Sequence, residues 1–306
     1  MITPTLNAAA TVREAVESVL AQGMAGVEHL VMDGASTDGT LEVLAEFPHL
    51  QVHSARDGGL YQAMNAGIRR ASGRWLVFLQ ADDVLLPGAL AAVAAAIQRN
   101  PGVEIVNGGA EARRGFRPDS ELVWRRSEPR ECELTAANVV LGEPMVNARV
   151  FRRDLVGQLG GFSTDYRLAS DRDFLLRAVE LNCPQVTIPH LVYRYCWHAG
   201  SRTMTEGNAL SRLLTEENLR IAEAHLARGG EEARPPLRQW HRQQSVQAAM
   251  MALEALDARG WLAAARRGLK VDRAWGAAFL REFGSSLRGF IGRGFRTRSQ
   301  VWRAGR

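Results

Sequence analysis

Two adjacent carboxylates, Asp82 and Asp83, stand directly after an apolar run that predicts a buried strand over residues 75–79. Acidic residues also occupy other predicted strand ends or loops, at Asp33, Asp57, Asp171 and Asp173. Taken singly, each is most simply explained as a helix cap. Taken together they would repel one another, and partial burial would raise that cost unless a cation or a hydrogen-bond donor offset it.

A divalent cation that prefers oxygen ligands would remove this repulsion. Mg²⁺ is usually held by one or two carboxylates together with substrate phosphates, and Mn²⁺ accepts the same ligands. The Asp82–Asp83 pair therefore predicts a metal that carries a diphosphate, although adjacent Asp residues are also common at ordinary helix N-termini.

The elements that must hold these residues alternate between strand and helix through residue 110. Short apolar runs predict strands at 1–4, 27–32, 50–53, 75–79 and 103–106. Periodic segments between them predict helices at 12–20, 40–47, 60–71 and 86–99. This alternation predicts a mostly parallel sheet covered on both faces, and such sheets bind ligands beyond the carboxyl ends of their strands. The first strand is short, which leaves open whether the native start lies upstream of Met1.

The rest of the chain changes character twice. From residue 111 to about 205 the pattern is less regular, with a hairpin around RPDSELVWRRSEP, a helix at 173–180 and strands at 185–188 and 191–195. From residue 208 only helical patterns remain. We therefore expect an α/β domain over residues 1–205 and a helical extension over 206–306.

Composition indicates a folded protein with reduced thiols. The 306 residues are 46% hydrophobic, which is ample for a core. The three cysteines form no CxxC pair, and the sequence shows neither a signal peptide nor the roughly 18 uninterrupted apolar residues of a membrane span. We expect a cytoplasmic protein.

The positive charge lies at the C-terminal end. The net charge is +5, but residues 259–306 hold twelve Arg or Lys and two acids, so this segment carries +10 and the rest −5. Apolar residues interleave with these arginines, and two interpretations stay open: contact with the anionic inner face of the cell membrane, or a solvated disordered tail. No nucleic-acid recognition motif is present, so no nucleic acid is expected as a partner.

Five motifs together resemble the family 2 glycosyltransferases of the GT-A fold: TPTLN at 3–7, DGASTDGT at 33–40, RDGGLYQAMNAGI at 56–68, FLQADD at 78–83 and SDRDFLLR at 170–177. They cover roughly residues 1–200 in the order of the family. The third motif is most similar to bacterial members that build surface or capsular polysaccharide. The resemblance implies a Rossmann-like GT-A sheet and an inverting hexosyltransferase that uses a nucleoside-diphosphate sugar.

The resemblance also implies a nucleotide site. By it, Pro4, Thr5 and Asn7 line the nucleoside site, Asp33 accepts a hydrogen bond from the base, and Asp57 makes a second nucleoside contact. A uracil presents one imide N–H, for which a carboxylate is a strong acceptor, so we expect a uridine diphosphate sugar, with guanosine and thymidine diphosphate left open as alternatives.

The remaining motifs imply a metal and a base. FLQADD stands in the place of the family's DxD motif, with Ala81 where many members have the first Asp. Its last position, Asp83, is the expected ligand of Mn²⁺ or Mg²⁺, and Asp82 is expected to face the ribose or sugar. SDRDFLLR resembles the motif that carries the catalytic base, which maps to Asp171, with Ser170 replacing the usual Glu. RYCWHAGSRTM, residues 194–204, resembles the segment that closes over the diphosphate, and His198 is a candidate metal or phosphate contact.

The expected acceptor is a hydroxyl of a glycan or a lipid-linked molecule, in polysaccharide or glycoconjugate biosynthesis of the cell envelope. Two alternatives stay open. The departures at Ala81 and Ser170 would suit a non-catalytic nucleotide-sugar-binding or scaffold protein. A sugar-1-phosphate nucleotidyltransferase would need a Gly-rich phosphate loop with a basic residue after the first strand, and TPTLNAAA has none.

Overall fold

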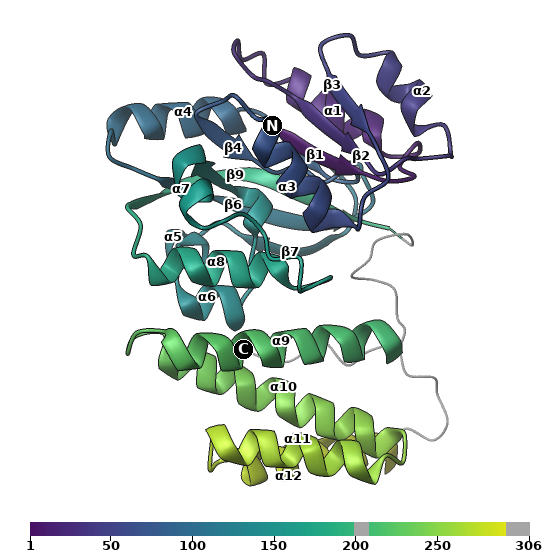
Figure 1. Ribbon diagram of the computed structural model, residues 1–306, viewed down its shortest axis with the longest axis vertical. Coiled ribbons are helices and arrows are strands. Elements are labelled where there is room, and N and C mark those ends of the chain that lie inside the picture. Colours follow the sequence, from purple (N-terminus) through teal and green to yellow (C-terminus); the bar gives the residue numbers. More distant parts are fainter. Residues whose placement is uncertain (199–207, 292–306) are drawn as a thin grey trace. The chain divides into compact units, whose positions relative to one another are not determined.

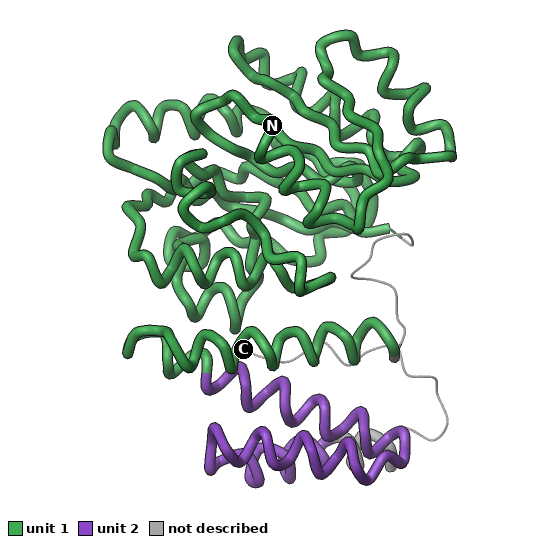
Figure 2. Tube along the Cα trace, viewed as in Figure 1, with its two compact units in different colours: residues 1–237 green, residues 238–306 purple. Residues whose placement is uncertain are grey.

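The structure is a computed structural model that describes residues 1–198 and 208–291. It divides into two compact units, residues 1–237 and 238–306 (Figure 2). We expected the division after residue 205, but helix α9 (Asn208–Arg228) groups with the first unit, where its side chains bond to helix α8 (Ser170–Glu180). Residues 199–204 of the expected closing segment and the tail beyond residue 291 lie outside the described residues.

A three-stranded parallel sheet begins the first unit (Figure 1). Its strands are β1 (Ile2–Thr5), β2 (Leu30–Asp33) and β3 (Gln51–Ser54), in that order, and its helices are α1 (Val12–Leu20), α2 (Thr40–Ala45) and α3 (Leu60–Arg70). The register sets Thr5 beside Asp33 and Asp33 beside Ser54, so the three carboxyl ends form one row. The alternation predicted for this part of the chain is confirmed.

The second sheet is mixed. Its strands are β4 (Trp75–Val77), β5 (Val84–Leu85), β6 (Ile105–Arg114), β7 (Leu122–Arg126), β8 (Arg149–Arg152) and β9 (Gln185–Trp197). The order is β4-β8-β6-β9-β5, with β7 beside β6, and β6 with β9 is the parallel pair among antiparallel ones. The expected parallel arrangement therefore holds for β1–β3. The loop between β6 and β7 is too short for a crossover, so these two strands must run antiparallel.

The two sheets meet along β1 and the end of β4. The Leu79 N–H donates to the Ile2 carbonyl oxygen at 3.0 Å, and Ile2 pairs with Phe78 in parallel. Because the pairing is parallel, the chain leaves this strand at the edge where β1 ends. Asp82 and Asp83 therefore follow the same row of carboxyl ends as Thr5 and Asp33.

Helix α3 approaches β1 closely. A Cβ on Gly67 would lie 2.4 Å from Cγ2 of Ile2, so no larger residue fits there without a shift of the helix. An apolar core lies on the second sheet and includes Val77, Leu79, Val106 and Tyr193. The other helices of this unit are α4 (Ala89–Arg99), α5 (Pro129–Cys132), α6 (Ala136–Val140) and α7 (Arg153–Gln158), with a 3-10 turn at Val146–Ala148.

The second unit is helical. It contains the end of α10 (Arg234–Glu254), α11 (Ala258–Val271) and α12 (Trp275–Ile291). Trp275 packs against α11 so closely that a Cβ on Gly268 would lie 2.0 Å from its Cδ1. Among the residues that the structure describes, no helix combines the length and the apolar character that a bilayer span requires.

Candidate active site

Asp33 is the centre of a tight turn at the end of β2. Its buried carboxylate accepts hydrogen bonds from the backbone N–H of Ala35 and of Ser36, both at 3.1 Å. It also accepts the hydroxyls of Ser36 and Ser54, the latter at 2.6 Å. Three of these donors reach Oδ2 and one reaches Oδ1, so Oδ2 is fully used by the turn and by β3.

The end of β1 carries the other expected nucleoside residues. Asn7 has a left-handed backbone with φ 51°, and its side-chain oxygen accepts the Thr37 N–H at 2.9 Å. Its own N–H donates to the Ser36 hydroxyl at 2.8 Å. Pro4 and Thr5 lie within β1, and the buried Oγ1 of Thr5 has no hydrogen-bond partner among the described residues. This edge therefore holds a polar atom that a ligand could satisfy.

Asp57 is exposed at the turn before α3. Its Oδ1 accepts the Gly59 N–H at 2.9 Å. A Cβ on Gly34 would lie 3.3 Å from its Oδ2, so Asp57 stands directly against the Asp33 turn. The structure thus brings Asp33 and Asp57 together, and of the two only Asp57 keeps a carboxylate oxygen without a protein donor in the described part of the chain.

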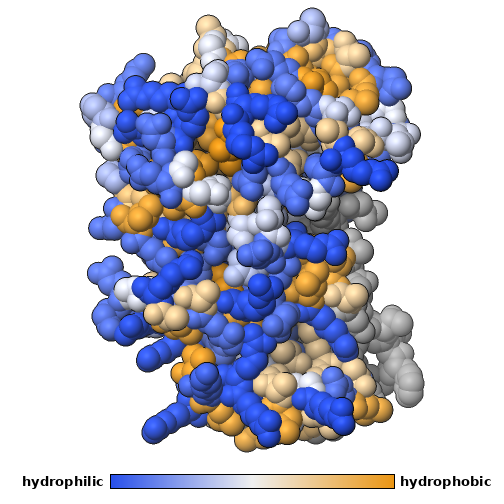
Figure 3. All heavy atoms as spheres, in the orientation of Figure 1, coloured by the Kyte–Doolittle hydropathy of each residue, from blue (hydrophilic) through white to orange (hydrophobic). Residues whose placement is uncertain are grey.

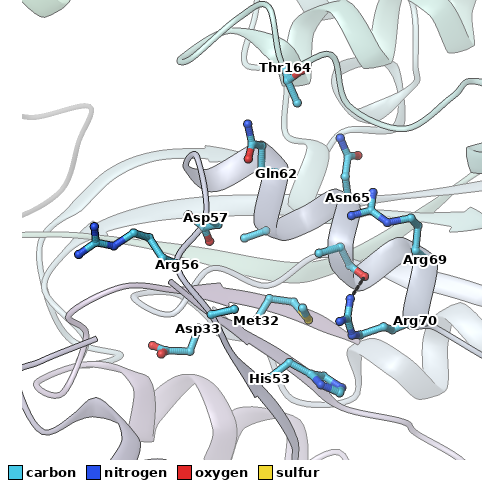
Figure 4. Close-up of a pocket in the computed structure, with 13 residues that line it drawn as sticks. Met32, Asp33, His53, Arg56, Asp57, Gln62, Asn65, Arg69, Arg70 and Thr164 are labelled. Carbon is cyan, nitrogen blue, oxygen red and sulfur yellow. Dashed lines mark hydrogen bonds between the residues drawn. The ribbon is translucent and has the colours of Figure 1, made fainter. Parts of the chain in front are cut away.

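A pocket of about 470 Å³ opens beside these two residues, between α3 and the strands β2 and β3 (Figure 4). Its apolar floor includes Met32 and Ala66, and its polar wall includes Gln62 and Asn65. Asp33, Arg56 and Asp57 lie at one end of it, and Arg69 and Arg70 lie at the other (Figure 4). The volume falls in the usual range of small-molecule sites.

Asp82 and His198 face each other. The His198 Nε2 lies 3.2 Å from the Asp82 Oδ2, and the Asp82 side chain is 37% exposed. At this distance the two side chains are hydrogen-bonded to each other, and a cation would have to replace that bond to be held by both. Among the described residues no third His, Cys, Asp or Glu joins them. Phosphate oxygens and waters would have to complete such a site, as is usual for Mg²⁺.

Asp83 is turned away from that pair. Its Oδ1 accepts the Cys196 N–H and its Oδ2 accepts the Tyr193 hydroxyl, both at 2.8 Å, and the residue is 5% exposed. Burial, followed by the charge of Asp82, raises the pKa of Asp83 well above its usual range. The expectation was that Asp83 would bind the metal and Asp82 the sugar, whereas the structure sets Asp82 beside His198.

Asp171 lies in the first turn of α8. Its Oδ1 accepts the Arg172 N–H at 2.8 Å and lies 3.4 Å from the Tyr61 hydroxyl, whose single proton is shared between this oxygen and the nearer Leu168 carbonyl oxygen at 3.0 Å. Burial raises the pKa of Asp171 above its usual range, against the opposing effects of Arg172 and Tyr61. Asp171 does not line the pocket beside Asp33, but a carboxylate with a raised pKa is suited to accept a proton nearer neutral pH.

The charges of Asp83 and Asp171 act on one residue, Tyr195. Burial, followed by the charges of Asp83 and Asp171, raises the pKa of the Tyr195 hydroxyl well above its usual range. Both carboxylates therefore act on the same part of β9. Asp173, two positions after Asp171, instead bonds to Arg177 at 2.9 Å and to His225 at 3.1 Å, which is a structural role.

Three residues near the site were not singled out from the sequence: Tyr61, Tyr193 and Glu217. Tyr61 stands inside the motif RDGGLYQAMNAGI, so the motif could have indicated it. Tyr193 and Glu217 carry no local signal, since their partners Asp83 and residues 167–169 lie far from them in the sequence.

A family model described as "Glycosyl transferase family 2" matches residues 1–156. A "PGL/p-HBAD biosynthesis glycosyltransferase" of Mycobacterium tuberculosis is 31% identical over 223 residues, which cover 71% of this chain and 80% of that relative. An uncharacterized glycosyltransferase of Haemophilus influenzae is 28% identical over 187 residues, which cover 59% of this chain and 61% of the relative.

Two solved structures share the fold. Residues 1–349 of TarS of S. aureus, solved with UDP-GlcNAc, superpose with a TM-score of 0.56 at 17% identity, over 90% of this chain and 91% of that segment. The mannosyltransferase PcManGT of Pyrobaculum calidifontis, solved with GDP-Man and Mn²⁺, superposes with a TM-score of 0.56 at 21% identity, over 95% of this chain and 80% of that one.

Proposed function

This chain belongs to glycosyl transferase family 2, and from that premise we propose that it moves a sugar from a nucleoside-diphosphate sugar to an acceptor hydroxyl with inversion. It is a glycosyltransferase with a GT-A fold. The observation that carries the proposal is Asp171, a carboxylate with a raised pKa at the start of α8. Its Oδ2 has no hydrogen-bond donor among the described residues and is available to an acceptor.

The proposed reaction needs one base on the acceptor side. The acceptor oxygen attacks the anomeric carbon as the bond from that carbon to the diphosphate oxygen breaks. The hydroxyl proton passes to Asp171, and the nucleoside diphosphate leaves. A positioned base of this kind contributes typically ~10²–10⁴-fold to the rate.

The test is Asp171→Asn, assayed by release of nucleoside diphosphate from UDP-sugars with Mn²⁺ and water or glycan acceptors. We expect turnover to fall by about 10²–10⁴-fold. Binding of UDP should stay within about twofold, because Asn keeps the size of the side chain. Asp165→Asn, which changes an exposed carboxylate in the preceding loop, is the matched control and should behave as wild type. Undiminished release by Asp171→Asn would remove this residue from its role.

For the donor we propose a uridine diphosphate sugar bound along the carboxyl ends of β1, β2 and β3. The buried Oγ1 of Thr5 and the unfilled Oδ2 of Asp57 support this placement. The Oδ1 of Asp33 already accepts the Ser36 hydroxyl, whereas no donor among the described residues reaches the Oδ2 of Asp57, so Asp57 is the more open acceptor for a uracil imide. Calorimetric screening of UDP, GDP and dTDP with Mn²⁺ tests the choice, and preferential binding of GDP would reject it.

We propose that Asp82 and His198 face a divalent cation. A bound Mn²⁺ or Mg²⁺ would neutralise the charge that develops on the diphosphate as the sugar leaves. The side chains would contribute one carboxylate and one imidazole, and the proposal is supported by their juxtaposition at the end of the strand that carries Asp82, where the hydrogen bond between them would give way to the cation. Asp83, directly before β5, bonds to β9 through Tyr193 and Cys196.

For the acceptor we propose a glycan or a lipid-linked molecule, in envelope polysaccharide or glycoconjugate biosynthesis, met at an anionic membrane face. The second unit supports membrane contact, since Leu262 and Leu269 are exposed on α11 beside its basic residues Arg259, Arg266, Arg267 and Lys270. On the face drawn in Figure 3, hydrophobic residues form small patches among charged ones. Co-sedimentation of the full chain and of Leu262→Glu with anionic vesicles tests this, and equal pelleting of both would reject the contact.

A further inference from the structure

Helix α9 holds the loop that leads to Asp171. The buried carboxylate of Glu217 on α9 accepts the backbone N–H of three consecutive residues: Arg167 at 2.7 Å, Leu168 at 2.9 Å and Ala169 at 3.0 Å. Glu217 is 2% exposed. Without it, this turn would leave buried N–H groups unpaired, which is costly in a protein interior. Residue 217 lies beyond the stretch that the family model matches.

The same turn is held from its other side by Tyr61. The Tyr61 hydroxyl donates to the Leu168 carbonyl oxygen at 3.0 Å and lies 3.4 Å from the Asp171 Oδ1. The peptide unit that joins Leu168 to Ala169 therefore gives its oxygen to Tyr61 and its N–H to Glu217. A peptide fixed at both ends sets the direction in which α8 begins, two residues before Asp171.

A second contact fastens α9 to α8. His225 lies between two carboxylates of α8, with its Nδ1 2.5 Å from the Glu180 Oε1 and its Nε2 3.1 Å from the Asp173 Oδ1. The two helices are thus joined near both ends of α8. Helix α9, which carries Glu217, therefore cannot move away from the loop at residues 167–169 without breaking these bonds.

We propose that Glu217 and Tyr61 are positioning residues for the base, so that α9 is part of the catalytic unit of this glycosyltransferase. The inference rests on the proposed role of Asp171. A misplacement of about 1 Å in a reacting group can cost about 10²-fold in rate, and a free turn at residues 167–169 would permit a shift of that size.

Tyr61 has a second effect, on the protonation of Asp171. Its hydroxyl favours the ionised carboxylate, and so do the charge and the N–H of Arg172, whereas burial favours the neutral form and raises the pKa of Asp171. The charge of Asp171 also helps to raise the pKa of the Tyr195 hydroxyl. Removing the Tyr61 hydroxyl should therefore raise the pKa of the base further.

The first test is Glu217→Gln, with Glu216→Gln as the control. Gln keeps the size and one acceptor oxygen, and Glu216 is the exposed neighbour on the same helix. We expect kcat for donor turnover to fall at least about tenfold in Glu217→Gln while KM for the donor changes less than about twofold, because the nucleotide contacts are elsewhere. The control should match wild type. A Glu217→Gln variant with wild-type kcat would overturn the role of Glu217.

The second test is Tyr61→Phe, which removes one oxygen and keeps the ring stacked on Phe162, whose centroid lies 5.5 Å away. We expect a lower kcat and an acidic limb of the kcat–pH profile displaced to higher pH. A loss of stability alone would lower the amount of active enzyme without moving that limb. An unchanged profile and kcat would overturn the role of Tyr61.

Asp171→Asn is measured beside these variants, because it tests the role of Asp171 separately from the roles of Glu217 and Tyr61. If Asp171→Asn keeps full turnover, the proposed function of Asp171 fails and this inference fails with it. If Asp171→Asn is inactive while Glu217→Gln and Tyr61→Phe behave as wild type, the inference fails alone. If all three lose turnover and Tyr61→Phe shifts the profile, both stand.

Discussion

Asp33 and Asp171 are carboxylates of the same unit that are held in opposite ways. Three of the four donors to Asp33 come from the next three residues, and the fourth comes from the neighbouring strand. Asp171 accepts the N–H of the next residue, Arg172, but it also lies 3.4 Å from the hydroxyl of Tyr61, 110 positions away. Its loop is held by Glu217, which is 48 positions from Ala169. One site is completed by a local turn, and the other is completed only by the folded unit.

This difference separates stability from turnover. A local turn saturates its carboxylate, so Asp33 organises the edge of the sheet more than it offers a free acceptor. Asp171 keeps an oxygen without a protein donor in the described part of the chain, and its environment raises its pKa. Substitutions in the first region should therefore act on folding, and those in the second on rate.

The largest expected effect distinguishes the neighbours Asp82 and Asp83. Asp82→Asn should weaken Mn²⁺-dependent binding of UDP by about 10–100-fold or more, because it removes the carboxylate that stands beside His198. Asp83→Asn should leave metal dependence in place and lower the melting temperature, because it disturbs the bonds to Tyr193 and Cys196. Calorimetry with and without EDTA, together with thermal melts, measures both.

A reversed result for that pair would restore Asp83 as the metal ligand. Loss of metal-dependent binding in Asp83→Asn with normal binding in Asp82→Asn would show that Asp83 leaves β9 when the donor binds. Full activity of the unaltered protein in EDTA would remove the metal from the proposal altogether.

A smaller effect is expected at the local turn. Asp33→Ala should lower the free energy of unfolding by about 1–3 kcal/mol, because it leaves the N–H groups of Ala35 and Ser36 without their acceptor. Urea unfolding measures the change. Asp57→Ala, at an exposed position beside the same turn, is the control and should alter stability much less. Equal losses in the two variants would contradict the contrast between a saturated and an open carboxylate.

The smallest expected effect is a pH dependence of stability at the α8–α9 contact. Burial alone would lower the pKa of His225, but the hydrogen bonds to Asp173 and Glu180 outweigh it and raise the pKa above its ordinary value of 6.5. The stability that the protonated His225 contributes is complete below pH 6.5. It is lost as the pH rises through the raised pKa of His225. The pKa values of Asp173 and Glu180 are lowered, despite burial, by His225 and the arginines, so their contribution disappears at acid pH instead.

The contribution of His225 to stability is measured from melting temperatures across neutral pH. The unaltered protein is compared with His225→Gln. The unaltered protein should lose stability as pH rises above 6.5, and His225→Gln should lose most of that slope. His53→Gln, on the edge strand β3, should keep it. A slope that is identical in all three proteins would show that His225 stays neutral in the folded state.

Much of the first unit could be predicted because its signals are short-range. The strands at residues 2–5, 30–33 and 51–54 and the helices between them follow from apolar runs and from 3.6-residue periodicity. The boundary at residue 205 and the division of roles between Asp82 and Asp83 could not be read in this way. They depend on β9 and α9, which return to the site from far along the chain.

The amino-acid sequence by itself determined the family, the alternating elements and the acids at the strand ends, because each of these is written within a few consecutive residues. Only the tertiary structure decided which of those acids is saturated, which stays open and which is held from a helix outside the family-matched stretch. The physical reason is that a carboxylate's state depends on its burial and on its donors. Both donors to Asp83 lie more than 100 positions away. Asp171 combines the N–H of the next residue with Tyr61, which also lies more than 100 positions away.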